Sequence, residues 1–411
     1  MALYTLPTEL IHAISTHLEL RDHLFLCRAS SRMQMICVKR IYRVLDLKSP
    51  VQLLQCFKTI IARPKAATSV RELSIRFYCP DYTLKSFHTM LRSAAARMEN
   101  LLVISVRDTA LLRSISDIAF VRLTDCSIPL SLDSYPFLGR NPTIEYVALL
   151  SLPSQTEFLS NIQPIRMPKL EHFVGPECAV YAVVPYAPVS TLSIWWMALE
   201  YSRGLTAAAS SKAELCELVN AVSFWDPALP RAIAKHTPRI QSLHIRGLLL
   251  SGLTPDKENF LSAIDDVLSS LTCLVELVVW DDTPPIDSIG DAFESEFDRI
   301  RKWGDICPTL IFASLTRTWA RFGVLWLPER SGTETEWIEC LKWLIKKALN
   351  RRQSPSCYCA VVADLEKGFH LVGSDEMQVL ADAAVRGEAL PAFDLLVKED
   401  GRPMIVFPSD S

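Results

Sequence analysis

The sequence predicts an α/β chain in which a small three-helix module precedes an irregular solenoid of parallel strands and outer helices. Two observations predict this fold class. Apolar residues recur every three to four positions over the first 47 residues, as they do in amphipathic helices. From residue 70 onward, short segments that alternate apolar and polar residues recur between helical segments, as half-buried strands do.

The first predicted helix begins near Pro7, whose fixed φ and missing N–H suit the first turn of a helix. Glu9 follows at the positive end of the helix dipole. The apolar stripe of this helix consists of Leu10, Ile11, Ile14 and Leu18. The spacing therefore predicts a helix with one buried face.

Two further short helices complete the module. The second is expected to begin at Asp22, with Leu24 and Cys27 facing inward. Ser30 and Ser31 provide N-cap chemistry for the third, whose apolar residues are Met33, Ile36 and Ile41. Three helices of this size bury little surface, so we expect the module to complete its core against a partner.

This pattern, from Leu6-Pro7-Thr8-Glu9-Leu10-Ile11 to the tail Ile41-Tyr42-Arg43-Val44-Leu45-Asp46-Leu47, resembles an F-box. An F-box docks a protein onto the Skp adaptor of cullin-type ubiquitin ligases. Ala29 and Met33 stand where F-boxes often have Val and usually an aromatic residue. The resemblance implies adaptor contacts by Leu6, Pro7, Leu10, Ile11, Ile14, Leu18, Leu24 and Cys27. The alternative is that residues 6–42 are only the capping helices of the following domain.

The body of the chain has the rhythm of a leucine-rich repeat, in which each repeat supplies one strand and one helix. Pro-x-Leu/Ile entries occur at Pro142, Pro168, Pro238 and Pro308. The predicted strands are 70–75, 100–106, 119–123, 144–149, 170–174, 191–195, 240–245, 274–280 and 310–315. Strands joined by helical crossovers run parallel, so one mainly parallel, curved sheet is expected. The arrangement is similar to that of many fungal F-box proteins, in which an F-box precedes a degenerate repeat domain.

These patterns predict four segments: an F-box at 1–47, a linker helix at 48–69, a repeat solenoid at 70–350 and a capping segment at 351–411. Helices are expected at 256–270, 286–303 and 334–350, and a boundary at 351–356. Within the capping segment the sequence predicts strands at 357–363 and 403–407 and a helix at 375–386. A repeat array needs such a cap because its last repeat has an open apolar face.

Charge, hydropathy and cysteine content indicate which classes of function and location fit this chain. Residues 1–110 hold 16 Lys and Arg against 8 Asp and Glu, but the cations are spread singly, which favours a solvated helix surface over a nucleic-acid site. No apolar run approaches the ~20 residues of a membrane span, and no signal peptide is present, so a cytoplasmic or nuclear protein is expected. The twelve cysteines lack paired spacing and are expected to be reduced and mostly buried.

No motif for nucleotide, zinc-protease or serine-hydrolase chemistry occurs, and we expect no cofactor and no metal. Cys357-Tyr358-Cys359 with His370 lacks the four paired ligands of structural zinc, which favours buried strand thiols. His12, His17 and His23 share no helical face and are expected at the surface of the first helices.

Tryptophan marks a candidate target site, because all nine lie after residue 194. Trp195 and Trp196 should point to opposite faces of a strand, and Trp280 leads into a stretch, 281–298, with seven acids and no base. The proposed target-binding residues are Trp195, Trp196, Trp280, Asp281 and Asp282. Such a groove would favour a basic protein partner. The alternative is an acidic helix N-terminus beside core Trp residues.

The expected function is that of a non-catalytic substrate-recognition subunit of an SCF-type ligase. The F-box would bind the Skp adaptor and, through it, a cullin, and the repeat domain would bind a protein target. A repeat scaffold without ubiquitination is the second hypothesis, and an enzyme built on the repeat-like body is the third. No contact with nucleic acid or membrane is expected.

Overall fold

The computed structural model describes residues 6–79, 84–150, 163–197, 200–248, 257–281, 289–315, 318–321, 327–328, 334–350, 371 and 374–408. The chain forms two compact units, unit 1 (1–215) and unit 2 (216–411). Both units combine helices with parallel strands, as the sequence predicts. The division at 215 falls within the predicted repeat region, and the four predicted segment boundaries stay predictions.

Unit 1 begins with three short helices, α1 (Thr8–Ser15), α2 (Leu20–Ala29) and α3 (Ser31–Ile41). The Ser30 hydroxyl accepts a hydrogen bond of 3.1 Å from the Met33 backbone N–H, which confirms the expected cap of α3. Helix α2 begins two residues before the expected Asp22. Instead, Asp22 Oδ2 accepts a hydrogen bond of 3.4 Å from the Glu19 backbone N–H and closes a capping box.

The core of the three helices is small. Ile11, Met33 and Ile36 are buried, and Leu6 and Leu26 pack against them. The expectation that Leu24 faces inward is wrong, because its side chain is 50% exposed. The inner face of α2 instead carries His23 and Leu26, and a helix turns Leu24 about 100° away from His23.

His23 also corrects the sequence interpretation, which placed the three early histidines at the surface. Its ring is buried, with Nδ1 lying 2.9 Å from the Glu19 carbonyl oxygen and Nε2 lying 3.0 Å from that of Ser15. The ring therefore joins the end of α1 to the start of α2. His17 is exposed, and the side chain of His12 lies outside the described residues.

Seven strands of unit 1 are parallel, and each pairs with the next in chain order. They are β1 (Val44–Leu47), β2 (Glu72–Ile75), β3 (Val103–Val106), β4 (Asp125–Pro129), β5 (Tyr146–Leu150), β6 (His172–Pro176) and β7 (Thr191–Trp195). The register aligns one row of buried side chains, Leu45, Leu73, Ile104, Cys126, Val147, Phe173 and Leu192. Their neighbours in sequence face the other side of the strands.

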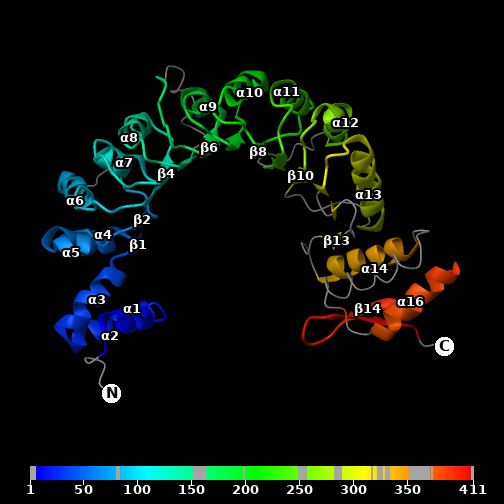
Figure 1. The fold of residues 1–411 in the computed structure, drawn as a ribbon, viewed down its shortest axis with the longest axis horizontal. Helices are drawn as coiled ribbons and strands as arrows, with labels where there is room; N and C mark the ends of the chain where they lie inside the picture. Colours follow the sequence, from blue (N-terminus) through cyan, green and yellow to red (C-terminus); the bar gives the residue numbers. More distant parts are fainter. Residues whose placement is uncertain are drawn as a thin grey trace. The chain divides into compact units, whose positions relative to one another are not determined.

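Helices connect these strands and lie on one side of them (Figure 1). They are α4 (Pro50–Ala62), α5 (Pro64–Ala67), α6 (Lys85–Ala95), α7 (Thr109–Ile115), α8 (Ser134–Arg140), α9 (Glu177–Val183), the short 3₁₀ helix η3 (Val184–Tyr186) and α10 (Tyr201–Ala209). Crossovers of this kind keep consecutive strands parallel, and these helices leave the other face of the strands uncovered (Figure 1).

One predicted strand of unit 1 is wrong. Residues 119–123 form no strand, and β4 begins at Asp125 instead. Phe120 and Leu123 are buried, as expected of apolar residues, but they lie in a loop rather than a strand. The buried side chain of Asn141 holds this loop by accepting a hydrogen bond of 2.6 Å from the Phe120 backbone N–H. Strand β1 was expected only as the tail of the helical module.

Unit 2 has four parallel strands, β8 (Glu217–Val222), β9 (Ser242–Gly247), β10 (Glu276–Asp281) and β11 (Phe312–Leu315). β12 (Thr318–Arg321) and β13 (Leu327–Pro328) follow in antiparallel order. The helices are α11 (Ala228–His236), α12 (Lys257–Val267), η4 (Leu268–Ser270), α13 (Ile289–Ile306) and α14 (Glu334–Asn350). Strand β8 has no counterpart among the predicted strands, whereas α12, α13 and α14 match the predicted helices closely.

The C-terminal part of unit 2 has a small core of its own. Helix α16 (Ser374–Arg386) and the antiparallel pair β14 (Asp394–Val397) and β15 (Pro403–Val406) pack against α14. α16 and β15 confirm the helix and strand predicted at 375–386 and 403–407. The buried residues that α14 supplies are Leu341, Leu344, Ile345 and Leu349. The boundary at 351–356, the strand at 357–363 and the Cys357, Cys359 and His370 set lie outside the described residues.

Candidate interaction surfaces

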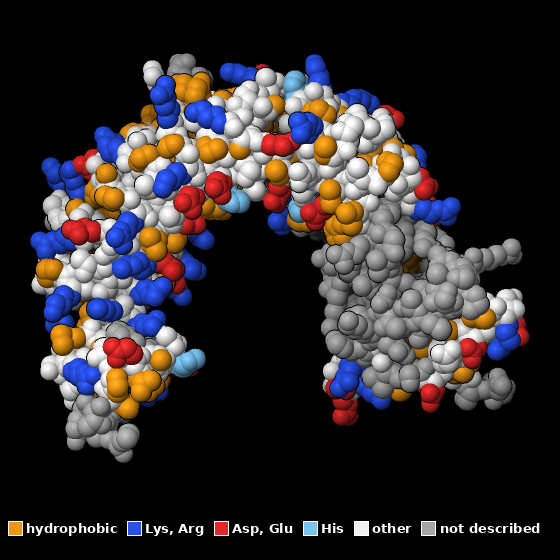
Figure 2. Space-filling view, viewed as in Figure 1, with side chains coloured by type: hydrophobic (Ala, Val, Ile, Leu, Met, Phe, Trp, Pro, Cys, Tyr) orange, Lys and Arg blue, Asp and Glu red, His pale blue; other side chains and the backbone are white. Residues whose placement is uncertain are grey.

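Helices α1 to α3 carry a surface of uncovered apolar side chains. Leu10 is 51% exposed, Leu24 50% and Phe25 56%. Ile14, Leu20 and Met35 are also exposed. Figure 2 shows hydrophobic side chains gathered on this part of unit 1. A cluster of this kind is uncommon on a surface that faces only water, since uncovered apolar area is costly in free energy.

The structure separates the eight predicted adaptor residues into three groups. Pro7, Leu10, Ile14 and Leu24 are exposed, and Leu6, Leu18 and Cys27 are half-buried. Ile11 is buried in the core of the three helices, so its role is to hold α1 against α3. Phe25 and Met35 are also exposed on these helices but have no place in the sequence-predicted set. Their exposure could be seen only once α2 and α3 were oriented.

Trp195 and Trp196, both in unit 1, point to opposite sides, as predicted. Trp195, the last residue of β7, is half-buried, whereas Trp196 is buried and stacks edge-on against Tyr201 with ring centroids 5.0 Å apart. A partner cannot reach Trp196, so its assignment as a target-binding residue is wrong. Trp195 stays accessible on the open face of the strands.

In unit 2, the open face of β9 and β10 carries a connected polar cluster. Parallel pairing aligns Ser242 with Glu276 across the two strands. The Ser242 hydroxyl donates a hydrogen bond of 2.8 Å to Glu276 Oε2. His244 Nε2 lies 3.2 Å from the Ser242 oxygen and 3.4 Å from Glu276 Oε1.

This cluster does not have the geometry of an activated serine. The Ser242 proton is directed to the carboxylate, so the serine oxygen is free to accept from His244 Nε2–H rather than to donate to it. An activated serine needs a histidine that takes its proton, with the acid on the opposite ring nitrogen. Here one ring nitrogen faces both neighbours. The arrangement joins the three side chains in one polar cluster on this face.

Trp280 continues this surface one row along β10. It is half-buried, its ring centroid lies 6.1 Å from that of His244, and Arg246 Cζ lies 6.0 Å from its ring centroid. Asp281 is the last residue of β10, but its side chain and all of Asp282 lie outside the described residues. Sequence reasoning missed Ser242, His244, Arg246 and Glu276. Alternation along each strand was visible, but the register that joins them was not.

The two candidate target surfaces lie in different units, Trp195 in unit 1 and Trp280 in unit 2. Trp225 and Trp303 are buried, so part of the tryptophan signal reflects core packing. Trp303 Nε1–H donates a hydrogen bond of 2.6 Å to Asp265 Oδ1, which fixes α13 against α12. The alternative interpretation of the tryptophans therefore holds for these two residues.

Disulfides, metal sites and membrane-spanning helices are absent from the described residues. None of the nine described cysteines forms a disulfide. Only Cys37, Cys126 and Cys307 among them are buried, so the expectation of mostly buried thiols is wrong for the described cysteines. Within the described residues, no group of three or more His, Cys, Asp or Glu side chains could hold a metal ion. None of the described helices has the length and apolar character required to cross a bilayer.

No protein-family model matches the chain. No curated protein matches its sequence either.

Proposed function

We propose that the chain is a substrate-recognition subunit of an SCF-type ubiquitin ligase. In this role, α1 to α3 act as an F-box that docks onto the Skp adaptor, and the strand-and-helix body, acting as a leucine-rich-repeat solenoid, binds a protein target. The chain itself breaks no covalent bond. It raises the effective concentration of the target beside the ubiquitin-charged partner of the ligase.

The uncovered apolar surface of α1 to α3 carries the proposal. Leu10, Ile14 and Phe25 leave about half of each side chain in water. Covering the rest contributes roughly 1 kcal/mol for each side chain. The sequence pattern from Leu6 to Leu47 resembles an F-box, which favours the Skp adaptor as the protein that covers these side chains. Ile11, Met33 and Ile36 hold the three helices together without using that outer surface.

The open faces of the parallel strands support the second half of the proposal. In unit 2 this face presents a hydrogen-bonded polar cluster beside the half-buried ring of Trp280. An aromatic anchor framed by fixed polar groups is typical of binding hot spots. We assign target recognition to this face, with Trp280 as the anchor.

The test is co-purification of the full chain with the Skp adaptor and a cullin. Leu10→Asp with Ile14→Asp places two charges in the apolar surface and should abolish adaptor binding. Val121→Asp with Leu132→Asp is the matched control, because these side chains are 78% and 65% exposed and lie outside α1 to α3. Adaptor binding that survives the first double variant, in a chain with unchanged thermal stability, would refute the F-box assignment.

The scaffold hypothesis predicts the same adaptor binding but a different downstream result. Reconstituted ligase containing this chain should transfer ubiquitin to proteins that bind the chain. A complex that assembles with adaptor and cullin but leaves every bound protein unmodified would favour the scaffold over the substrate receptor.

A further inference from the structure

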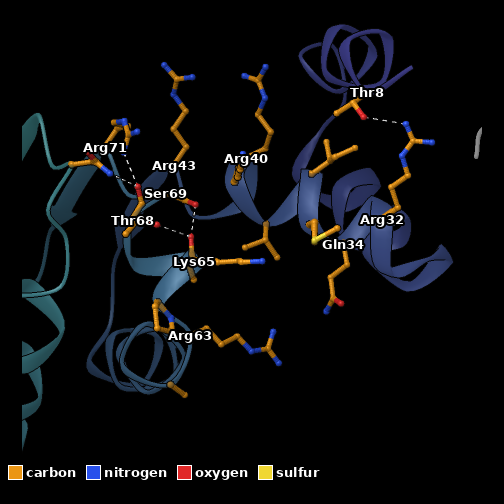
Figure 3. A pocket seen from close by; sticks show the side chains of 18 residues that line it. Thr8, Arg32, Gln34, Arg40, Arg43, Arg63, Lys65, Thr68, Ser69 and Arg71 are labelled. Carbon is orange, nitrogen blue, oxygen red and sulfur yellow. Dashed lines mark hydrogen bonds between the residues drawn. The ribbon is translucent and has the colours of Figure 1, made fainter. Parts of the chain in front are cut away.

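A basic groove lies in unit 1 between α3 and α5 (Figure 3). Its volume is about 1450 Å³. Every charged residue that lines it is a cation, and these are Arg32, Lys39, Arg40, Arg43, Arg63, Lys65 and Arg71. The cations come from segments about 30 residues apart in sequence, 32–43 and 63–71, which the fold brings together. Sequence analysis read the same cations as a dispersed helix surface.

Some cations elsewhere in unit 1 form ion pairs with acids. Arg76 Nε lies 2.9 Å from Asp46 Oδ1, and Arg113 Nε lies 3.0 Å from Asp133 Oδ2. In the groove, by contrast, Lys39, Arg40, Arg43, Arg63 and Lys65 form no ion pair with any of the residues that the structure describes. Five cations that repel one another are thus gathered without a counter-charge, which favours an anionic ligand.

Hydrogen bonds at both ends of the groove involve none of these five side chains as donors or acceptors. Arg71 Nη1 donates to the Thr68 carbonyl oxygen at 2.9 Å, and the Ser69 hydroxyl donates to that of Lys65 at 2.6 Å. At the other end, Arg32 Nη2 donates to the Leu6 carbonyl oxygen at 2.7 Å. In Figure 3, Arg40 and Arg43 extend in the same direction, while Lys65 and Arg63 extend from the α5 side.

The lining is also partly apolar. Met35, which is 56% exposed, lines the groove together with Val38 and Pro64. The volume exceeds that of a usual small-molecule pocket, about 300–1,000 Å³. A single small anion would leave the apolar part uncovered. An extended segment that carries both acidic and apolar side chains matches the size and the chemistry of the groove.

The lining does not favour nucleic acid. None of its side chains is aromatic. Proteins that bind single strands stack bases on aromatic rings in addition to attracting the phosphates. A lining that attracts anions but cannot stack bases suits the carboxylates of a peptide better than a nucleic acid.

We infer that this groove binds an acidic peptide segment of a partner protein, one in which Asp and Glu residues are interspersed with apolar residues. The inference does not rest on the proposed function, although Met35 belongs both to the groove and to the exposed apolar surface of α1 to α3. Carboxylates of the segment pair with Arg43, Arg63 and Lys65, and its apolar side chains cover Met35 and Val38.

The test measures fluorescence anisotropy of the full chain with a short labelled peptide made of Asp-Glu pairs separated by single Leu residues. Replacing Arg43, Arg63 and Lys65 by Gln should weaken binding by about tenfold or more, because each exposed pair contributes modestly and three are lost. The matched control replaces Arg122, Arg166 and Lys169 by Gln, three exposed cations of unit 1 outside the groove. The control should change the affinity less than about twofold.

A charge-reversal variant tests the inference even if the triple variant fails to fold. Arg43→Glu with Lys65→Glu should lose the acidic peptide and gain a peptide in which Lys replaces Asp and Glu. Equal weakening by the groove and control variants would overturn the inference, because the attraction would then be a property of net charge. So would equal binding of a peptide with Asn and Gln in place of the acids. Tighter binding of single-stranded DNA, or of inositol hexakisphosphate, at the same salt concentration would replace the acidic peptide with a phosphate ligand.

Discussion

Asn141 at the end of α8 holds the backbone of Phe120, 21 residues earlier in the chain. Its Oδ1 accepts a hydrogen bond of 2.6 Å from the Phe120 N–H, and its Nδ2 donates to the carbonyl oxygens of Phe137 at 2.8 Å and Ile118 at 3.3 Å. The side chain is fully buried. One amide thus satisfies three backbone groups, two of them in buried hydrogen bonds.

Asn141→Ala should lower the free energy of unfolding by about 3 kcal/mol, since buried backbone groups without partners cost about 1–3 kcal/mol each. Urea denaturation of the full chain measures this change. Asn100→Ala is the control, because its Nδ2 donates only one, exposed hydrogen bond, of 2.9 Å to the Thr68 carbonyl oxygen. A cost below about 1 kcal/mol is expected there. Equal costs for the two variants would contradict the prediction.

Gly204 in α10 lies against the ring of Trp196. A Cβ added at this position would lie 2.8 Å from the ring carbons Cη2 and Cζ3. Trp196 cannot move freely because Tyr201 packs against it. Gly204→Ala should therefore destabilise the chain by roughly 1–3 kcal/mol, as overpacking does.

Gly139 provides the matched control for this substitution. It also lies inside a helix of unit 1, α8, but an added Cβ would meet nothing within 4 Å. Gly139→Ala should be neutral or should stabilise by about 0.5–1 kcal/mol, because alanine restricts the unfolded chain more. Thermal melts that show the same sign for both variants would be inconsistent with the packing at Trp196.

The strand pattern was predictable wherever apolar alternation coincided with a short entry turn. The strand at 191–195 matches β7, and seven other predicted strands contain most of their observed counterparts. The prediction of a strand at 119–123 was wrong because these mostly apolar residues lie in a loop that Asn141 holds. A side chain 21 positions away decides that conformation, and periodicity carries no information about such a contact.

The candidate surfaces were predictable only in part. Local spacing placed Leu10 and Ile14 together on one helix face, and both are exposed. It could not orient α2, so Leu24 was expected inside and Phe25 was overlooked. The groove cations and the cluster at Ser242 and Glu276 depend on segments about 30 residues apart coming together, which is set by tertiary packing.

Trp280 should contribute strongly to target capture. Trp280→Ala removes an aromatic anchor, and such truncations typically cost about 2 kcal/mol, or about 30-fold in affinity. The measurement compares proteins recovered with wild-type and variant chains, using the co-purified adaptor as the internal standard. Trp195→Ala, at the open face of unit 1, tests the other surface separately.

The charge of the target can be tested in the same experiment. Asp281→Asn with Asp282→Asn should weaken capture of a basic target, and the loss should be larger at low salt because screening is weaker. Arg246 beside Trp280 makes this surface mixed in charge, so we expect the target to carry both signs near its anchor. A partner list unchanged by both the Trp280 and the aspartate variants would remove the assignment of unit 2 to target binding.

Alkaline pH should destabilise unit 1 through its thiols. Burial raises the pKa of Cys56 from 9.0 to about 11, and burial likewise raises the pKa of Cys37 and Cys178 to about 11. Above pH 9.0 the unfolded chain releases protons that the folded chain still holds, so proton release favours unfolding. The contribution of these thiols is complete below pH 9.0 and is lost as the pH rises to about 11. We therefore expect the melting temperature to fall more steeply with pH in the wild-type chain than in a Cys37→Ala, Cys56→Ala, Cys178→Ala variant, and parallel slopes would contradict it.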